Sequence, residues 1–281
     1  MQKEAQLVKS APIGIFDSGL GGLTALREIR RILPNEDLIY FGDTGRVPYG
    51  SRSHETICKY AAQDMRFLLE KAPCKAIVVA CGTVSANALP TLRAQFDVPV
   101  IGVIEPAVSA AVGKSKNKRI GVIATAATVA SHAYEDALTS LCPEIEVISR
   151  ACPLFVPLVE NGFTDPTDPI PRMVAERYLK DIIDAGCDTV ILGCTHYPML
   201  APVISAVLGE NVTLIDTGRE VAHALRALLK ATNTEKTDDV GTLSCFVSDE
   251  PHGFAAVAAA FLGVENEAEL PSVEKIDIEA Y

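Results

Sequence analysis

The sequence predicts an α/β fold built on largely parallel sheets that helices cover on both faces. Three observations lead to this prediction: short apolar runs rich in β-forming residues recur along the chain, amphipathic helical patterns separate most of them, and glycine-containing turn segments follow several of the runs. Such alternation is typical of parallel strands joined by crossover helices. Ligands of these folds bind outside the carboxyl ends of the strands, so we expect the chemistry directly after each run.

The first half of the chain shows the pattern in order. The apolar run 13–16 leads through a glycine-rich turn into 23–33, whose apolar side chains recur at helical spacing, and 37–41 is expected to be the second strand. A second amphipathic helix is expected over 56–71, and the continuous apolar run 75–80 is typical of a strand buried on both faces. The remaining predicted elements are a helix over 85–95 and strands at 98–103, 119–124, 145–149, 189–192 and 212–215.

Two of the strand-to-helix junctions resemble each other. Val-Ala-Cys-Gly-Thr at 79–83 and Leu-Gly-Cys-Thr-His at 192–196 both follow an apolar run, and both lead into a helical pattern with an early proline. Two similar half-sites indicate two similar domains that face each other. Chance similarity between short junctions is the alternative interpretation.

Composition and charge restrict the class of protein. The chain has 281 residues and a net charge of −11, which argues against a nucleic-acid partner because phosphates require a basic surface. No apolar run approaches the roughly 18 residues of a membrane span. Residues 1–12 carry Lys3 and Glu4 and lack the apolar core of a signal peptide. We therefore expect a cytoplasmic protein with no membrane contact.

Two of the eight cysteines stand out by position. Cys81 and Cys194 each come at the end of a predicted strand and directly before a predicted helix. The partial positive charge of a helix N-terminus favours the thiolate, so we expect a lowered pKa at both thiols. No C-x-x-C pair occurs, and a cytoplasmic setting disfavours disulfides. The other cysteines are expected to be packing residues: Cys58, Cys74, Cys142, Cys152, Cys187 and Cys245.

A pair of thiols in matching settings suits racemisation at a carbon acid. A racemase removes a proton from one face of the α-carbon and returns a proton to the opposite face, so it needs one base and one acid. Backbone N–H groups at helix N-termini would stabilise the substrate carboxylate. We expect Asp17, Glu160 and His196 to orient and tune the two thiols. Glu160 ends the apolar run 154–159, so its carboxylate is expected to be partly buried.

Six motifs, in order along the chain, carry a resemblance to a known family. They are Phe-Asp-Ser-Gly-Leu-Gly-Gly-Leu-Thr at 16–24, Tyr-Phe-Gly-Asp-Thr at 40–44, Pro-Tyr-Gly at 48–50, Pro-Val-Ile-Gly-Val-Ile-Glu-Pro at 99–106, Cys-Pro-Leu-Phe-Val-Pro-Leu-Val-Glu at 152–160 and Leu-Gly-Cys-Thr-His-Tyr-Pro at 192–198. From about residue 12 to residue 247, the chain resembles the glutamate racemases of the cofactor-independent aspartate/glutamate racemase superfamily.

The resemblance implies a two-domain fold and a site in the cleft between the domains. We expect residues 1–103 with 217–281 to form the domain that carries Cys81, and 104–216 to form the domain that carries Cys194. The two thiols would be the acid and base, without cofactor or metal, and the product would be D-glutamate for peptidoglycan. The oligomeric state is left open, with a homodimer as the candidate assembly. Substrate-binding or thiol-supporting positions carried over from the family are Asp17, Ser18, Tyr49, Gly50, Gly82, Thr83, Thr125, Thr195 and His196.

One departure and three alternatives qualify this interpretation. The family usually has Asn-Thr-Ala-Ser after the first cysteine, whereas this chain has Gly-Thr-Val-Ser at 82–85. Gly82 therefore removes a side chain that would contact the substrate, unless glycine serves a backbone shape with positive φ. The alternatives are a racemase for another acidic amino acid such as aspartate, a related lyase or isomerase that needs one cysteine, and a non-catalytic binding protein.

Overall fold

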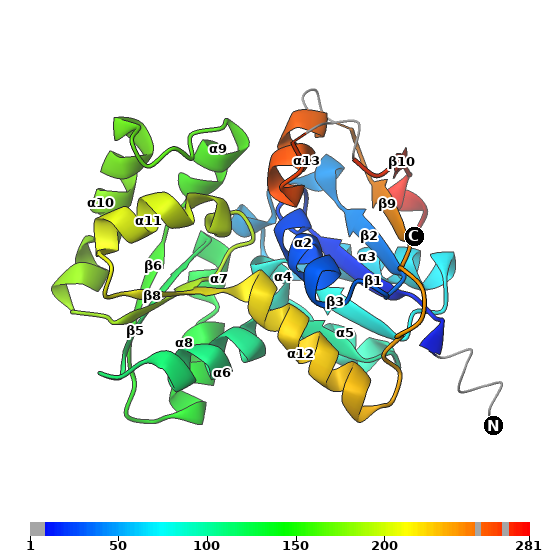
Figure 1. Ribbon diagram of the computed structural model, residues 1–281, viewed down its shortest axis with the longest axis horizontal. Helices are drawn as coiled ribbons and strands as arrows, with labels where there is room; N and C mark the ends of the chain where they lie inside the picture. Colours follow the sequence, from blue (N-terminus) through cyan, green and yellow to red (C-terminus); the bar gives the residue numbers. More distant parts are fainter. Residues whose placement is uncertain (1–8, 251–253, 266–269) are drawn as a thin grey trace.

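The computed structural model describes residues 9–250, 254–265 and 270–281, so Lys3 and Glu4 lie outside the described residues. Two wholly parallel sheets form the core of the molecule, in strand orders β10-β9-β2-β1-β3-β4 and β6-β5-β7-β8. We call them, with their flanking helices, the six-stranded lobe and the four-stranded lobe. They lie side by side (Figure 1). The predicted α/β class with two parallel sheets is confirmed.

The six-stranded sheet contains two strands that the sequence did not predict, β9 and β10, which extend it at the edge beyond β2. Its strands are β1 (Ile13–Asp17), β2 (Leu38–Gly42), β3 (Ala76–Val79), β4 (Val100–Gly102), β9 (Leu243–Val247) and β10 (Val273–Lys275). The three central strands are buried along their whole length, which explains their continuous apolar sequences.

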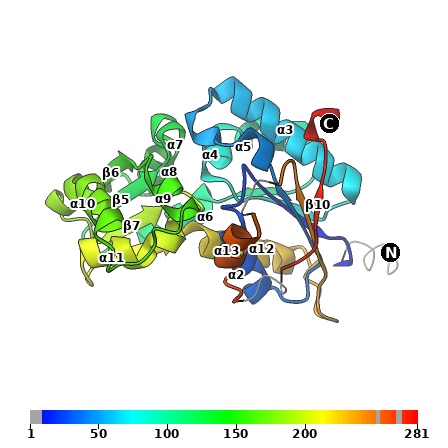
Figure 2. The same cartoon turned by 90° about the horizontal axis from the view of Figure 1, so that it is seen from above.

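Helices cover both faces of the six-stranded sheet (Figure 2). Alternate side chains of β1 divide between two apolar clusters, with Ile13 and Ile15 in one and Phe16 in the other. The first face is covered by α2 (Leu23–Ile32), α12 (Thr217–Ala231) and α13 (Phe254–Leu262). The opposite face is covered by α3 (His54–Lys71), α4 (Gly82–Asn87) and α5 (Leu89–Gln95).

The four-stranded lobe has the same layered plan. Its strands are β5 (Arg119–Ala124), β6 (Glu146–Ala151), β7 (Thr189–Leu192) and β8 (Thr213–Asp216). One face is covered by α6 (Ile104–Lys114) and α8 (Ala133–Leu141), and the other by α10 (Pro169–Asp184) and α11 (Ala201–Leu208). Two short helices lie near the carboxyl ends of its strands, α7 (Ala126–Ala130) and α9 (Phe155–Glu160).

The single helix predicted over 85–95 is wrong, because the segment forms two helices, α4 and α5. They meet at Ala88, and Pro90 occupies the first turn of α5. Proline has no backbone N–H to donate and its ring clashes with a preceding turn, so a helix begins there more readily than it continues.

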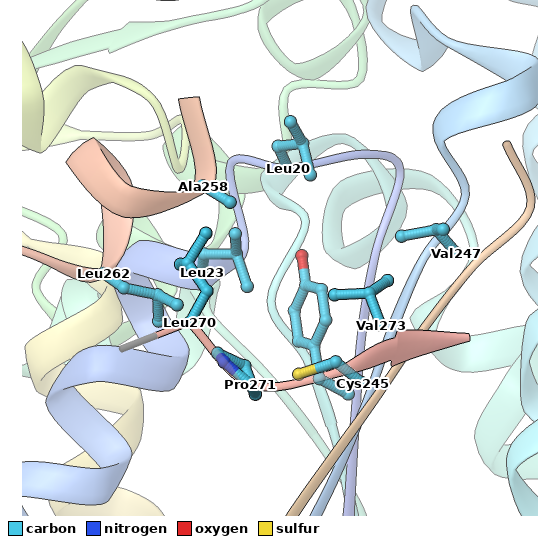
Figure 3. A pocket seen from close by; sticks show the side chains of 10 residues that line it. Leu20, Leu23, Cys245, Val247, Ala258, Leu262, Leu270, Pro271 and Val273 are labelled. Carbon is cyan, nitrogen blue, oxygen red and sulfur yellow. The ribbon is translucent and has the colours of Figure 1, made fainter. Parts of the chain in front are cut away.

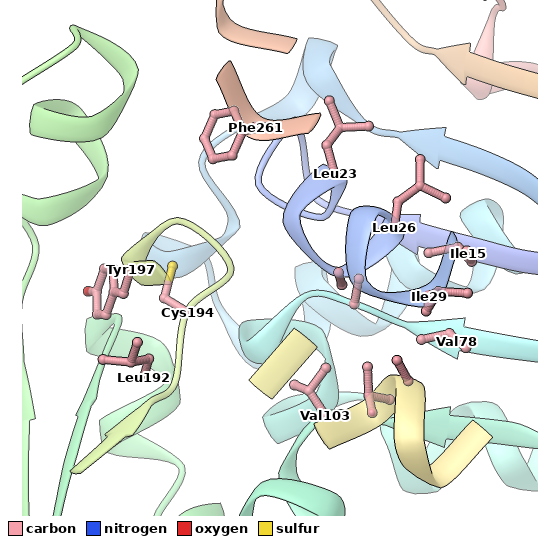
Figure 4. Close-up of a cluster of buried hydrophobic side chains, with 14 of the residues drawn as sticks. Ile15, Leu23, Leu26, Ile29, Val78, Val103, Leu192, Cys194, Tyr197 and Phe261 are labelled. Carbon is pink, nitrogen blue, oxygen red and sulfur yellow. The ribbon is translucent and has the colours of Figure 1, made fainter. Parts of the chain in front are cut away.

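The chain crosses between the lobes twice, after β4 and after β8. The largest apolar cluster contains residues of both lobes. Figure 4 shows Leu192, Cys194 and Tyr197 on the side of the four-stranded lobe, and Leu23 and Phe261 on the other side. The lobes therefore share buried surface near the carboxyl ends of their strands. The predicted domain boundaries at 103/104 and 216/217 stay a prediction.

A small apolar gap lies between α13, the start of α2 and strands β9 and β10 (Figure 3). Its volume is about 20 Å³, enough for one water at most, so it is too small for a ligand. In the part of the chain that the structure describes, no helix is both long and apolar enough to cross a membrane.

Candidate active site

A cavity of about 320 Å³ lies between the lobes, at the carboxyl ends of the strands, and both Cys81 and Cys194 line it. This volume suits a small-molecule ligand. The six-stranded lobe lines it with Ser18, Gly19, Val47, Pro48, Tyr49, Gly50, Ser51, Cys81, Gly82 and Thr83. The four-stranded lobe contributes Thr125, Ala126, Pro153, Val156, Pro157, Glu160, Cys194, Thr195, His196 and Tyr197. The structure thus brings together every predicted site residue except Asp17, which lies just outside the lining.

Cys81 follows β3 and is the N-cap residue of α4, as the sequence predicts. Its side chain is buried, and its Sγ lies 3.4 Å from Oγ of Ser18, to which the thiol donates. The predicted lowering of the pKa is wrong for this thiol. Burial, followed by the nearby carboxylate of Asp17, raises the pKa of Cys81 to about 12. A six-residue helix offers too little positive charge to compensate for the loss of water.

Asp17 ends β1 and lies buried behind the cavity wall. One of its carboxylate oxygens accepts from the backbone N–H of Gly19 at 3.0 Å, and the other accepts from the Thr195 hydroxyl at 3.5 Å. Burial raises the pKa of this carboxyl. The family positions imply that Asp17 contacts the substrate, but its buried place behind the cavity wall does not favour a direct contact. Its contacts link the Gly19 turn and the four-stranded lobe to the neighbourhood of Cys81.

Cys194 follows β7, but no α-helix begins directly after it. A turn at Thr195 and His196 leads into a 3₁₀ helix, Tyr197–Leu200, and only then into α11. The predicted helix N-terminus at this thiol is therefore wrong. A charged neighbour takes its place, because Nδ1 of His196 lies 3.8 Å from the Cys194 Sγ.

His196 connects the Cys194 thiol to a carboxylate. Its Nε2 lies 2.9 Å from Oε1 of Glu160. Burial alone would lower the pKa of His196, but the hydrogen bonds to Cys194 and Glu160 outweigh it and raise the pKa to about 10. The imidazole is accordingly in its charged form near neutral pH, beside a group that becomes negative when it acts as a base.

Glu160 is only partly buried, as the sequence predicts. Its side chain is 46% exposed at the end of α9. In the helix, Phe155 and Val159 are one turn apart and face the core, whereas Leu154 is exposed. Only one face of this surface helix is covered, so the apolar run 154–159 does not bury all of its side chains or the carboxylate that follows it.

Threonine hydroxyls join the lobes on another wall of the cavity. Oγ1 of Thr83 lies 3.0 Å from Oγ1 of Thr125, and Thr125 also lies 2.9 Å from the hydroxyl of Thr128. Behind the cavity, the buried Thr24 hydroxyl donates to the carbonyl of Thr195 at 2.8 Å. Sequence reasoning missed Thr24, although it closes the first motif of the family resemblance.

A buried polar network supports the loop at 47–51 from behind. The Tyr49 hydroxyl donates to Asp43 and lies 3.4 Å from Asp64, so it is directed toward these carboxylates and away from a ligand. Arg46 lies between the two carboxylates, 2.6 Å from Asp43 and 3.0 Å from Asp64. Burial, and then the negative charge of Asp43, raise the pKa of Asp64 well above its ordinary value. Sequence reasoning missed Arg46 and Asp64.

None of the described residues that line the cavity is a lysine or an arginine. Its donors are hydroxyls, thiols, backbone N–H groups and the charged ring of His196. An anionic ligand would therefore be held mainly by neutral donors, as backbone nests and helix N-termini hold anions elsewhere. Among the described residues, no group of three or more histidine, cysteine, aspartate or glutamate side chains is placed to hold a metal ion.

Comparison with known proteins assigns the chain to a family. Residues 14–225 match the family model described as Asp/Glu/Hydantoin racemase. The chain belongs to this racemase family. It is also 46% identical over 269 residues to the glutamate racemase of Geobacter metallireducens, an alignment that covers 95% of this chain and 97% of that protein.

Solved structures of racemases agree with this assignment. The glutamate racemase isoform RacE1 of Bacillus anthracis has a TM-score of 0.90 and 38% identity to this chain, over 96% of this chain and 98% of that one. The glutamate racemase of Francisella tularensis, solved in complex with D-glutamate, has a TM-score of 0.89 and 39% identity, over 97% of this chain and all of that one. The family that the sequence motifs indicate is confirmed.

Proposed function

We propose that this protein interconverts L-glutamate and D-glutamate by proton transfer at Cα between two cysteines, without a cofactor. The observation that carries the proposal is the placement of Cys81 and Cys194: one thiol comes from each lobe, and both line the same cavity. The glutamate racemases of Geobacter metallireducens, Bacillus anthracis and Francisella tularensis, to which the chain is similar over almost its whole length, support the choice of substrate.

The reaction uses one thiolate and one thiol. The thiolate takes the Cα proton, so the Cα–H bond breaks, an S–H bond forms, and the electron pair is left on the substrate as a carbanion stabilised by its carboxylate. The thiol on the opposite face then gives its proton to Cα and becomes the thiolate. The product is the other enantiomer, and the two cysteines have exchanged protonation states. The same site therefore works in both directions.

The groups beside each thiol fit different tasks. At Cys194, the charged His196 balances the negative charge of a thiolate, and Glu160 holds the ring in place through the opposite nitrogen. At Cys81, burial and Asp17 oppose ionisation, so the thiolate there is a strong base once it forms. We assign Glu160 and Asp17 as positioning residues, because each acts through a neighbour.

Substrate carboxylates would be held by the neutral donors of the lining. The hydroxyls of Ser18, Thr83, Thr125 and Thr195 are the side-chain donors available for this task. Tyr49, Gly50 and Gly82 would contribute backbone N–H groups, because the Tyr49 hydroxyl is directed to Asp43 and the glycines have no side chain. Burying these neutral donors against a ligand costs less solvation free energy than burying charged donors would.

The physiological role that follows is the supply of D-glutamate for peptidoglycan, and the cytoplasm is the compartment where it would be made. We propose no nucleic-acid partner. Assembly as a homodimer stays a prediction, which light scattering on the purified protein would test.

The function is tested by incubating the purified protein with L-glutamate and, separately, with L-aspartate, and separating the enantiomers by chiral chromatography. We expect D-glutamate to form without added pyridoxal phosphate, in an amount that a chelator does not reduce. The aspartate racemase of Picrophilus torridus shares only the fold, at 17% identity and a TM-score of 0.57. Racemisation of aspartate in preference to glutamate would contradict the proposed substrate, and no turnover of either would favour a binding protein.

A further inference from the structure

The backbones of the two lobes approach each other closely directly beside the two thiols. A Cβ atom placed on Gly82 would lie 2.3 Å from the carbonyl oxygen of Gly193. Gly82 is the residue after Cys81, and Gly193 is the residue before Cys194. The contact therefore joins the two lobes at the residues adjacent to the proposed acid and base.

Glycine at position 82 does not serve an unusual backbone conformation. Gly82 is the first residue of α4, and its φ is not in the positive range that favours glycine, unlike Gly162, Gly186, Gly209 and Gly263. The backbone-shape explanation considered from the sequence is therefore wrong. The close approach of Gly193 is what excludes a side chain.

Two more glycines of the six-stranded lobe meet the four-stranded lobe in the same way. A Cβ on Gly50 would lie 2.9 Å from Cβ of Thr125, and a Cβ on Gly21 would lie 2.3 Å from Oγ1 of Thr195. The Thr195 hydroxyl can move by rotation of its side chain, whereas Cβ of Thr125 moves only with the start of α7. The neighbour of Gly82 is a carbonyl oxygen on the backbone segment that follows β7, so it can move away only if that segment, or the lobe that carries it, moves.

We propose that Gly82 sets how closely the two lobes approach and thereby fixes the separation of the Cys81 and Cys194 thiols across the substrate. This inference rests on the proposed function. A side chain at position 82 would push the Gly193 carbonyl away by a substantial fraction of an ångström and would act as a wedge between the lobes. A misplacement of about 1 Å between reacting groups costs on the order of a hundredfold in rate.

The close approach of Gly193 also changes the expected effect of an asparagine at position 82, where the family pattern has one. From the sequence, an asparagine at position 82 would add a contact to the substrate. In this structure, the space for its Cβ is already occupied by the Gly193 oxygen, so Gly82→Asn should open the cleft before its amide reaches a ligand.

Gly82→Ala tests whether a side chain at position 82 separates the lobes, with Gly113→Ala as the matched control. Both glycines lie in helices, but a Cβ on Gly113 meets no atom within 4 Å. The first measurement does not depend on turnover: alkylation of each cysteine by iodoacetamide, followed by mass spectrometry. Cys81 and Cys194 are buried, so in Gly82→Ala both should be alkylated several-fold faster, while the buried Cys245, which does not line the cavity, should keep its rate.

The second measurement is turnover of L-glutamate in deuterated water. We expect Gly82→Ala to lower kcat about tenfold to a hundredfold and to raise the ratio of deuterium in unreacted L-glutamate to deuterium in D-glutamate. The ratio should rise because a thiol separated from its partner can exchange its proton with solvent and return it to the same face. A folding defect would lower both processes together and would leave the ratio unchanged.

The outcomes separate this inference from the proposed function. If the wild-type protein does not racemise glutamate but Gly82→Ala still speeds the alkylation of both cysteines, the proposed function is contradicted and the role of Gly82 in lobe separation is supported. Wild-type alkylation rates and a wild-type kcat in Gly82→Ala would contradict the role of Gly82 and leave the proposed function intact. Loss of the folded state in Gly82→Ala would also contradict that role, because a wedge should leave both lobes folded. A lower KM with an unchanged kcat in Gly82→Asn would show that a side chain there reaches the substrate.

Discussion

Nε2 of His196 lies 2.9 Å from Oε1 of Glu160, so the carboxylate bonds the ring nitrogen that faces away from Cys194. Together with the thiol, this carboxylate keeps the pKa of His196 near 10 against the effect of burial. Because that value lies above the ordinary 6.5, the interaction stabilises the folded protein fully below about pH 6.5. The stabilisation is lost as the pH rises through about 10.

Glu160→Gln should lower the pKa of His196, because it removes the charge that favours the imidazolium. We expect the alkaline limb of the pH profile of kcat to move to lower pH by about one unit, since a hydrogen bond to a charged group contributes roughly 1.5–3 kcal/mol and half-exposure screens part of it. Glu176→Gln is the control, because Glu176 pairs with Arg172 on the exposed surface of α10. An unmoved alkaline limb in Glu160→Gln would contradict the role given to this pair.

The Cys81 thiol should react slowly in the free protein, and faster as the pH rises. Its pKa is raised to about 12, so the reactive thiolate fraction should grow about tenfold per pH unit between pH 7 and pH 10. The measurement is the rate of iodoacetamide modification at Cys81, followed by mass spectrometry in parallel with a small free thiol. The modification rate of the small thiol should level off once the pH exceeds its ordinary pKa of about 8.5. A plateau at Cys81 in the same range would show that burial does not control this thiol.

Arg46→Met should destabilise the protein, because it leaves Asp43 and Asp64 buried without their positive partner. Removing one member of a buried ion pair typically costs about 3–5 kcal/mol of the free energy of unfolding. The exposed Arg172, paired with Glu176, offers the comparison: Arg172→Met should cost less than about 1 kcal/mol. Urea denaturation of the two variants and the wild type measures both values. Equal effects would mean that the network behind Tyr49 contributes no more than a surface ion pair.

Much of the fold could be predicted from the sequence, because buried parallel strands have continuous apolar sequences. The strands that escaped prediction are the last two on one side of the sheet: β10 is the edge strand, and β9, beside it, is buried only in its second half. Val273–Lys275 has three residues, two of them charged and exposed, so its sequence has no apolar run to detect. Its strand conformation depends on pairing with β9.

The members of the site could be predicted better than their properties. Cys81, Cys194 and His196 follow strands, and strand ends converge in this class of fold, so their meeting follows from the pattern. The raised pKa of Cys81 depends on how the lobes exclude water, and the exposure of Glu160 depends on which face of α9 is covered. These are consequences of tertiary packing, which residue order alone does not specify.

The proposed mechanism requires one thiol from each lobe, each acting on its own face of Cα. Proton NMR of L-glutamate in deuterated water tests this requirement, with the wild-type protein, Cys81→Ser and Cys194→Ser compared at equal concentration. We expect the wild type to form D-glutamate that carries deuterium at Cα, and each serine variant to lose racemisation by at least about a thousandfold, since a hydroxyl is far too weak an acid near neutral pH. Racemisation close to the wild-type rate by either variant would contradict the two-thiol account.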